Sequence, residues 1–292
     1  MKKPKLYSTK YILFPENKLA PDKMLYLVGL GLYDEKDVTL RGHEIIKKCD
    51  KVYLEAYTSI LMISKARLEE FYGKKIIEAD RDMVELQAED ILESAKNQDV
   101  ALLVVGDPFS ATTHSDIVLR AFSLGIKVQS VHNASILTAI GDTGLFLYNF
   151  GPTISIPFFT DNWKPASFYH KLKENMDKKY HTLCLLDIKV KEQSEENLSK
   201  GKKIYEPPRF MSVSTAVSQL LFLEDQEKLG LVSLESKAIA VARLGSPDQK
   251  IVYGTFKELL NFDMGSPLHS LIVPGELHEI ELEMLSYFRI NN

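Results

Sequence analysis

The chain has 292 residues, of which 45% are hydrophobic and 26% are charged, and its formal net charge at pH 7 is −4. This composition is typical of a globular protein with a hydrophobic core, long enough for two domains. The negative charge argues against direct nucleic-acid binding through a broadly basic surface. No apolar run approaches the roughly 20 residues that a membrane-spanning helix needs, so we expect no membrane association.

The N-terminal segment, residues 1–23, is rich in lysine, lacks arginine and has only a short apolar patch at residues 11–14. A secretory signal needs a longer apolar stretch, and a mitochondrial presequence is usually rich in arginine. We therefore predict a mobile extension or an extra strand. The two cysteines, Cys49 and Cys184, lie far apart. They fit buried thiols in a reducing compartment, so we expect a cytoplasmic protein. The seven histidines show no metal-ligand spacing, and no metal site is predicted.

The first half of the chain alternates short apolar runs with amphipathic stretches. Strands are predicted at residues 25–30, 52–56, 75–79, 100–105 and 128–131. Residues 100–105 would place apolar side chains on both faces of the strand, which is typical of a central strand buried on both faces. The predicted helices include one capped by Asp37 or Thr39, one at 64–72 that ends at Gly73, one with an apolar face at Val84, Ala88, Ile91, Leu92 and Ala95, and one that ends at Gly125. This alternation predicts a mainly parallel sheet with helices on both faces.

The second half of the chain has a different pattern. Strands are predicted at residues 153–159, 182–190, 238–244 and 251–255. A hairpin around Ser246-Pro247-Asp248 requires antiparallel neighbours, so we expect a mixed sheet. Residues 191–209 are polar and lysine-rich, which predicts an exposed loop. The predicted boundary near residues 133–136 gives an N-terminal α/β domain at 24–134 and a C-terminal α/β domain at 135–292.

The turn after the first predicted strand reads Gly29-Leu30-Gly31-Leu32-Tyr33-Asp34. Glycines in such a turn let the backbone approach the pyrophosphate of a dinucleotide at a helix N-terminus. The third glycine of that motif is absent, and Asp34 would place a carboxylate beside the diphosphate. An NAD-dependent oxidoreductase is therefore disfavoured. The other interpretation is a tight strand-to-helix turn.

Polar residues follow the fourth and fifth predicted strands, in Gly106-Asp107-Pro108-Phe109-Ser110 and in His132-Asn133-Ala134-Ser135. Doubly wound sheets bind ligands beyond the carboxyl ends of their strands, so two polar strand ends side by side indicate a site. A carboxylate at Asp107 suits a ribose hydroxyl or a cationic group better than a phosphate. The alternative is an aspartate that caps a turn.

Other polar residues are weaker candidates for the same cleft. Glu55, Tyr57, Thr58 and Ser59 end the second predicted strand. His114 and His269, each considered alone, are more often structural than functional. The chain has neither a nucleophile elbow nor a metal motif, which argues against serine-type acyl transfer and metal hydrolysis. No residue is assigned a catalytic role.

Several blocks of sequence together resemble the diphthine synthase family, in the family's order from Met24 to the C-terminus. They are Leu25-Tyr26-Leu27-Val28-Gly29-Leu30-Gly31-Leu32, Tyr53-Leu54-Glu55-Ala56-Tyr57-Thr58-Ser59, Gly106-Asp107-Pro108-Phe109 with Ala111-Thr112-Thr113-His114, Tyr148-Asn149-Phe150-Gly151, and Pro267-Leu268-His269-Ser270-Leu271. This family belongs to the tetrapyrrole methylase superfamily. The resemblance implies two α/β domains that bind S-adenosyl-L-methionine in the cleft between them, in a homodimer.

The resemblance also implies a cofactor pocket and a substrate. The pocket residues would be Leu32, Asp107, Ser110, Ser135, Ile136, Leu186, Leu244 and His269. Two residues depart from the family pattern, because Tyr33 and Ser110 occupy positions where glycine is common. S-adenosylmethionine has a cationic sulfonium and no phosphate, so Asp34 no longer conflicts with the ligand. The product would be S-adenosyl-L-homocysteine.

The implied acceptor is the 3-amino-3-carboxypropyl-histidine of translation elongation factor 2. The segment 191–209 resembles the eukaryotic branch, whose members add three methyl groups to the amine and a fourth to the carboxylate, giving diphthine methyl ester. Archaeal relatives add three, so trimethylation alone is one alternative. A tetrapyrrole methylase with a porphyrin-type acceptor, an NAD-dependent oxidoreductase and a non-catalytic module that binds the translation factor are the others.

Overall fold

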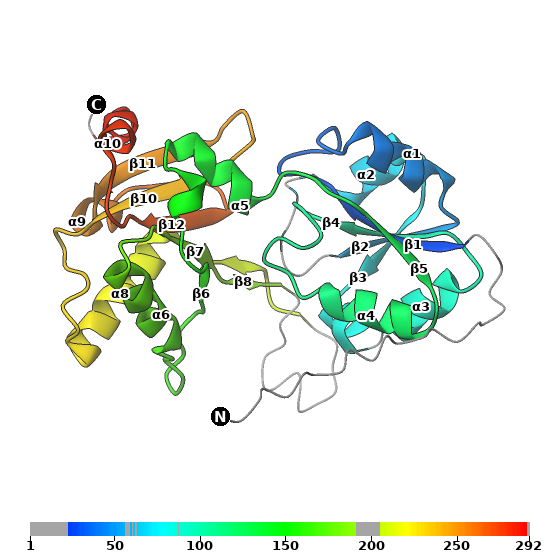
Figure 1. The fold of residues 1–292 in the computed structure, drawn as a ribbon, viewed down its shortest axis with the longest axis horizontal. Coiled ribbons are helices and arrows are strands. Elements are labelled where there is room, and N and C mark those ends of the chain that lie inside the picture. The colour runs from blue at the N-terminus through cyan, green and yellow to red at the C-terminus, as the bar shows by residue number, and fades with distance from the viewer. Residues whose placement is uncertain are drawn as a thin grey trace, which may run out of the picture.

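The structure is a computed structural model that describes residues 23–55, 59, 61, 63–86, 88–190 and 205–290. Each half of the chain forms one five-stranded sheet covered by helices (Figure 1). The α/β fold predicted from the sequence is thus confirmed. The predictions for residues 1–22, Tyr57, Thr58 and 191–204 lie outside the described residues. In the described ranges, no helix combines the length and the apolar character needed to cross a bilayer.

The first sheet is entirely parallel, as predicted, with the strand order β3-β2-β4-β1-β5. Its strands are β1 (Met24–Gly29), β2 (Lys51–Glu55), β3 (Ile76–Ala79), β4 (Val100–Val104) and β5 (Lys127–Val131). Strand β4 is central and all five of its residues are buried, which confirms the prediction made from its apolar run.

Helices cover both faces of this sheet. Alternate side chains of a strand point to opposite faces, and the apolar side chains on both faces pack against helices. The first face is covered by α1 (Leu40–Lys48) and α2 (Lys65–Tyr72), and the second by α3 (Glu89–Ala95) and α4 (Ser115–Ser123) (Figure 1). The segment η1 (Asp82–Leu86) also packs against the second face. On β1, Tyr26 and Val28 pack toward the first face, while Leu25 and Leu27 pack toward the second.

Local signals set the ends of several helices. The hydroxyl of Thr39 accepts a hydrogen bond from the Gly42 amide at 3.0 Å and caps α1, one of the two caps predicted. Gly73 ends α2 in the left-handed conformation at φ +64°, also as predicted. The predicted apolar face from Val84 to Ala95 is buried, but it is divided between η1 and α3.

The second sheet is mixed, as predicted, with the order β11-β10-β12-β7-β6. Its strands are β6 (Ile154–Ile156), β7 (Thr182–Leu186), β10 (Lys237–Ala242), β11 (Lys250–Thr255) and β12 (His269–Val273). Strands β6 and β7 are parallel and the other pairs are antiparallel, so the hairpin around Ser246-Pro247-Asp248 is confirmed.

Two predicted strands are too long. Strand β6 ends at Ile156, just before Pro157, which has no amide hydrogen for a ladder. The predicted strand 182–190 is interrupted at Asp187, whose carboxylate accepts a hydrogen bond from the Phe158 amide at 2.9 Å. Beyond it, β8 (Ile188–Lys189) pairs with β9 (Arg209–Phe210), so Arg209 belongs to a short strand and not to a loop as predicted.

Helices also cover both faces of the second sheet. One face packs against α6 (Ser167–Asp177), α8 (Val213–Glu227) and α9 (Phe256–Leu259), and the other against α5 (Ile136–Ala139), η2 (Ile140–Thr143) and α10 (Glu279–Ser286). The prediction of buried thiols is confirmed, with Cys49 in a core of the first sheet and Cys184 in a core of the second. Burial raises the pKa of each thiol to about 12.

Candidate functional site

Three loops meet at the carboxyl edge of the first sheet, following β1, β4 and β5. Strand β1 lies between the other two strands, so their polar ends are not direct neighbours as the sequence suggested. The loops nevertheless touch above β1: Gly31 and Gly106 exchange backbone hydrogen bonds of 3.2 and 2.7 Å. A Cβ on Gly29 would lie 2.6 Å from the Gly106 carbonyl oxygen and 2.9 Å from the Asn133 Cβ. The glycines after β1 therefore let neighbouring loops close over the strand.

Substituting Gly29 with alanine is expected to lower the free energy of unfolding by about 1–3 kcal/mol, since the new methyl group meets backbone that cannot move aside. The control is Gly141→Ala, where the nearest atom would be 3.7 Å from the new Cβ, an ordinary contact distance. Denaturant unfolding of both variants measures the difference. Equal stability of the two variants would contradict this account of the glycine turn.

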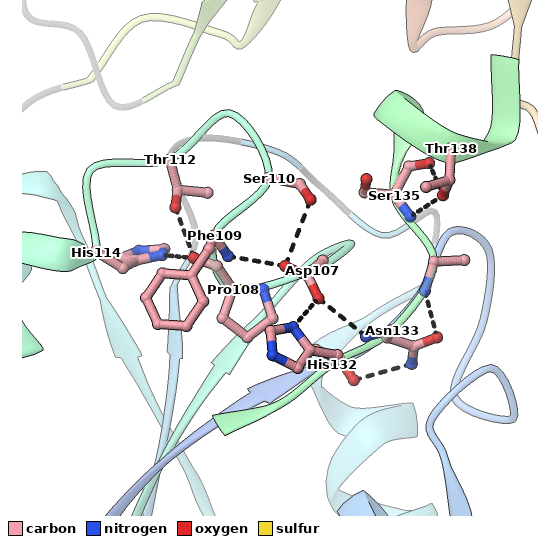
Figure 2. A network of polar contacts seen from close by, with 12 residues as sticks. Asp107, Pro108, Phe109, Ser110, Thr112, His114, His132, Asn133, Ser135 and Thr138 are labelled. Atoms are coloured by element: carbon pink, nitrogen blue, oxygen red, sulfur yellow. Dashed lines mark hydrogen bonds and ion pairs between the residues drawn. The ribbon is translucent and has the colours of Figure 1, made fainter. Parts of the chain in front are cut away.

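Asp107 ties two of these loops together (Figure 2). Its Oδ1 accepts hydrogen bonds from the Phe109 amide at 3.0 Å and the Ser110 hydroxyl at 3.4 Å. Its Oδ2 accepts from His132 Nδ1 at 2.8 Å and from the Asn133 amide at 3.1 Å. Burial opposes ionisation, but these hydrogen bonds outweigh it and lower the pKa of Asp107.

A cavity of about 470 Å³ lies between the two sheets. Its walls come from the three loops and from β7, β8, β10 and β12, and its size is that of a small-molecule or cofactor site. Seven of the eight residues predicted to bind the cofactor line it: Leu32, Ser110, Ser135, Ile136, Leu186, Leu244 and His269. Asp107, the eighth, does not line it. The contact of Asp107 with a cofactor stays a prediction. Its hydrogen bond from the Phe109 amide fits the alternative interpretation, an aspartate that caps a turn.

Two polar atoms of cavity-lining residues are buried without a hydrogen-bond partner, Ser135 Oγ and His269 Nδ1. His269 Nε2 lies 3.1 and 3.0 Å from the carbonyl oxygens of Gly265 and Ser266, so Nε2 carries the hydrogen and Nδ1 offers a lone pair. Burial lowers the pKa of His269, which favours the neutral ring. Unpaired buried polar atoms are costly, so a ligand that supplies partners gains affinity here.

The cavity also contains an ion pair that the sequence analysis missed. Arg243, with its backbone at φ +50°, donates from Nε to the Asp248 carboxylate at 2.7 Å and from Nη2 to the Asp248 carbonyl at 3.0 Å. Its Nη1 donates to the carbonyls of Met264, at 3.1 Å, and Ser266. Among the described lining residues, Arg243 is the one permanent cation, and four of its five N–H donors are used. The cavity therefore suits a ligand without phosphate.

The structure distinguishes among the weaker candidates for the site. Ser59 lines the cavity, whereas Glu55 is fully buried at the end of β2 and does not. His114 is 1% exposed, and its Nδ1 donates to the Pro108 carbonyl at 2.8 Å. This contact fits the structural interpretation of His114.

Comparisons with known proteins identify the family of this chain. Residues 24–260 match the family model described as Tetrapyrrole (Corrin/Porphyrin) Methylases. The chain belongs to the tetrapyrrole methylase family. Membership of the tetrapyrrole methylase family makes the protein a methyltransferase, so the fold and the enzyme class predicted from the sequence are confirmed. The NAD-dependent oxidoreductase alternative finds no support here.

Within the tetrapyrrole methylase family, the chain is similar to proteins named diphthine methyl ester synthase. The human protein is 56% identical over 272 residues, covering 91% of this chain and 95% of its own length. The Aspergillus fumigatus protein is 55% identical over 269 residues, covering 92% and 94%. A putative diphthine synthase from Entamoeba histolytica has a similar crystal structure, with a TM-score of 0.83 and 48% identity, covering 93% of this chain and 100% of that one.

Proposed function

We propose that this protein transfers methyl groups from S-adenosyl-L-methionine to the 3-amino-3-carboxypropyl arm of a modified histidine on translation elongation factor 2. The amine is methylated three times and the carboxylate once, so that the product is diphthine methyl ester. Identities of 55–56% to proteins named for this reaction, over more than 90% of the chain, support the acceptor. The observation that supports the cofactor is that seven residues predicted to bind it line one cavity between the sheets.

The cavity's chemistry fits this cofactor. Its one guanidinium is already paired with Asp248, so nothing in the described lining offers a free cation to a phosphate. Ser135 Oγ can donate or accept a hydrogen bond, and His269 Nδ1 can accept one. A nucleoside supplies hydroxyl and amino groups that match both atoms. When bound, the cofactor supplies a methyl group on a cationic sulfur.

The protein's contribution to the reaction is alignment. In-line methyl transfer from a sulfonium disperses charge, and positioning of the reacting atoms can supply up to about 7–11 kcal/mol. The three loops of the first sheet and the strands β7, β10 and β12 form opposite walls of the cavity, so together they fix the methyl donor. An α-amino group has a pKa of about 8 in water, so part of it is neutral near pH 7 and a dedicated general base is not required.

Mass spectrometry of the precursor-bearing elongation factor tests the proposal after incubation with the protein and labelled S-adenosylmethionine. We expect four added methyl groups, one of which is lost on mild ester hydrolysis. Three methyl groups would instead support trimethylation alone. Turnover of a porphyrin-type acceptor, with none of the elongation factor, would favour a tetrapyrrole methylase. An unmodified factor that still binds the protein would indicate a binding module.

We also infer a cytoplasmic homodimer. Several large apolar side chains are exposed on η3 (Leu147–Asn149) and on and beside α10, namely Leu147, Tyr148, Ile280, Leu282, Met284 and Tyr287. The two elements lie close together, because the Phe146 ring stacks on Tyr148 and lies 5.6 Å from the His278 ring. An apolar surface of this kind supports association with a second copy. Sedimentation equilibrium that gives the mass of a single chain would contradict the dimer.

A further inference from the structure

The chain passes from the first sheet to the second through residues 132–135, between β5 and α5. Asn133 is half-buried in this connection, at the carboxyl edge of the first sheet (Figure 2). It does not line the cavity, but Ser135 and Ile136, which follow it, do. The position of one cavity wall therefore depends on how this connection is held.

Both donor hydrogens and the oxygen of the Asn133 side-chain amide are hydrogen-bonded. Its Nδ2 donates one hydrogen bond to the Gly29 carbonyl at 3.0 Å and another to the Asp37 carbonyl at 2.9 Å. Its Oδ1 accepts from the Ala134 amide at 2.7 Å. An aspartate could not donate to the two carbonyls, and an alanine could make none of these bonds. Only a short amide meets all three requirements, and Gly29 leaves room for it, with the would-be Cβ 2.9 Å from the Asn133 Cβ.

The second acceptor, Asp37, extends this network to the loop after β1 on the same wall of the cavity. The Asp37 carboxylate accepts hydrogen bonds from the amides of Leu32, at 3.1 Å, and Tyr33, at 2.8 Å. Leu32 and Tyr33 both line the cavity. Asn133 thus connects the loop that carries Leu32 with the segment that carries Ser135, although Asn133 itself does not line the cavity.

We propose that Asn133 is a positioning residue: its amide fixes the connection between the two sheets to the loop after β1, and thereby sets the spacing of Leu32 and Ser135 on the first-sheet wall of the cofactor pocket. The proposal rests on the proposed function, because it assigns the effect of Asn133 to cofactor binding and methyl transfer. Loss of the amide removes one donor from each of two carbonyls and lets the two loops move relative to each other.

The test compares Asn133→Ala with Asn175→Ala by calorimetric titration with S-adenosylhomocysteine. Asn175 is a matched control, because it lies in α6 away from the cavity and its Nδ2 also donates two hydrogen bonds, to the Pro152 carbonyl at 2.9 Å and the Thr182 hydroxyl at 3.0 Å. We expect Asn133→Ala to weaken binding about tenfold, the effect of one or two lost hydrogen bonds. Asn175→Ala should lower Tm and leave the affinity within about twofold.

Two further variants sharpen the comparison. Asn133→Asp should bind S-adenosylhomocysteine no better than Asn133→Ala, since a carboxylate faces two carbonyl oxygens. Asn133→Ser, which keeps one donor, should have intermediate affinity, and it carries the test if Asn133→Ala does not fold. With the elongation factor as acceptor, KM for S-adenosylmethionine should be lowest in the wild-type protein, higher in Asn133→Ser and highest in Asn133→Ala and Asn133→Asp.

Equal affinity of Asn133→Ala and the wild-type protein would overturn this proposal alone. An equal loss of affinity in Asn175→Ala would also overturn it, because a general loosening of the fold would then explain the weaker binding of both variants. A wild-type protein that binds no S-adenosylhomocysteine would instead overturn the proposed function, and the role of Asn133 with it.

Discussion

Replacing Arg243 with alanine is expected to weaken S-adenosylhomocysteine binding by roughly 30- to 100-fold. The guanidinium donates to the Asp248 carboxylate and to three carbonyl oxygens, and thereby joins the tip of the β10–β11 hairpin to residues 264–266. Its side chain is 8% exposed although that of Asp248 is 66% exposed, so the guanidinium end of these bonds is shielded from water. Loss of charge-assisted hydrogen bonds in such surroundings costs about 2–3 kcal/mol, which corresponds to this change in affinity.

The same substitution should also disturb His269. The Ser266 carbonyl accepts from both Arg243 and His269 Nε2, so movement of residues 264–266 frees the ring that presents Nδ1. Arg243→Lys keeps the charge but lacks the planar fork, and its affinity should be intermediate. Arg120→Ala is the control, because Arg120 makes an ion pair with Asp116 at 2.7 Å on α4 outside the cavity. Calorimetry that finds wild-type affinity in Arg243→Ala would refute this role.

Glu281→Ala is expected to lower the free energy of unfolding by about 3–5 kcal/mol, because three buried hydrogen-bond donors lose their acceptor, at about 1–3 kcal/mol each. The side chains of Glu281 and His181 are both 0% exposed, with Oε1 and Nε2 3.0 Å apart. Glu281 also accepts hydrogen bonds from the amides of Phe146, at 2.7 Å, and His278, at 2.8 Å. One carboxylate thus joins α10, the segment before η3 and the start of β7. Denaturant unfolding measures the loss.

The same carboxylate gives stability a defined dependence on pH. Burial opposes its ionisation, but the Phe146 and His278 amides and His181 outweigh burial and lower the pKa of Glu281. Because the folded pKa lies below the unfolded value of about 4.3, this stabilisation is complete above that value and is lost as the pH falls through the folded pKa. Stability of the wild-type protein should therefore fall more steeply in acid than that of Glu281→Gln.

The control for this pair is Glu276→Gln, which removes an exposed ion pair with Lys179. Exposed pairs contribute about 0–1 kcal/mol, so this variant should follow the wild-type curve at every pH. Parallel acid profiles for Glu281→Gln and the wild-type protein would show that the buried carboxylate does not set the dependence.

The sequence predicted the first sheet well because its signals are local. The continuous apolar run at Val100–Val104 marks a strand buried on both faces, and Thr39 and Gly73 mark helix ends through short-range chemistry. The long helix α8 was missed, although Val213, Ala216, Val217, Leu220 and Leu223 recur at helical spacing and are buried. That signal was present and a periodicity count would have found it.

Other features depend on contacts between distant segments. The break at Asp187 requires the amide of Phe158, and the role of Arg243 requires carbonyls about twenty residues further along the chain. Neither appears in a local pattern. For the pocket, the resemblance to a family supplied the residues, and the fold brought seven of them to one cavity. The exception is Asp107, whose carboxylate turns to His132 and Asn133 in the loop after β5 and does not line the cavity.

The two cysteines provide one reporter for each half of the molecule. Thiol reagents attack the thiolate, and with a pKa of about 12 and no exposed surface neither Cys49 nor Cys184 reacts while its surroundings remain folded. Alkylation followed by peptide mapping would therefore record local opening separately around each sheet. If a bound nucleoside holds the two halves together, it should slow labelling at both positions, whereas a ligand held by one half would protect only that half's cysteine.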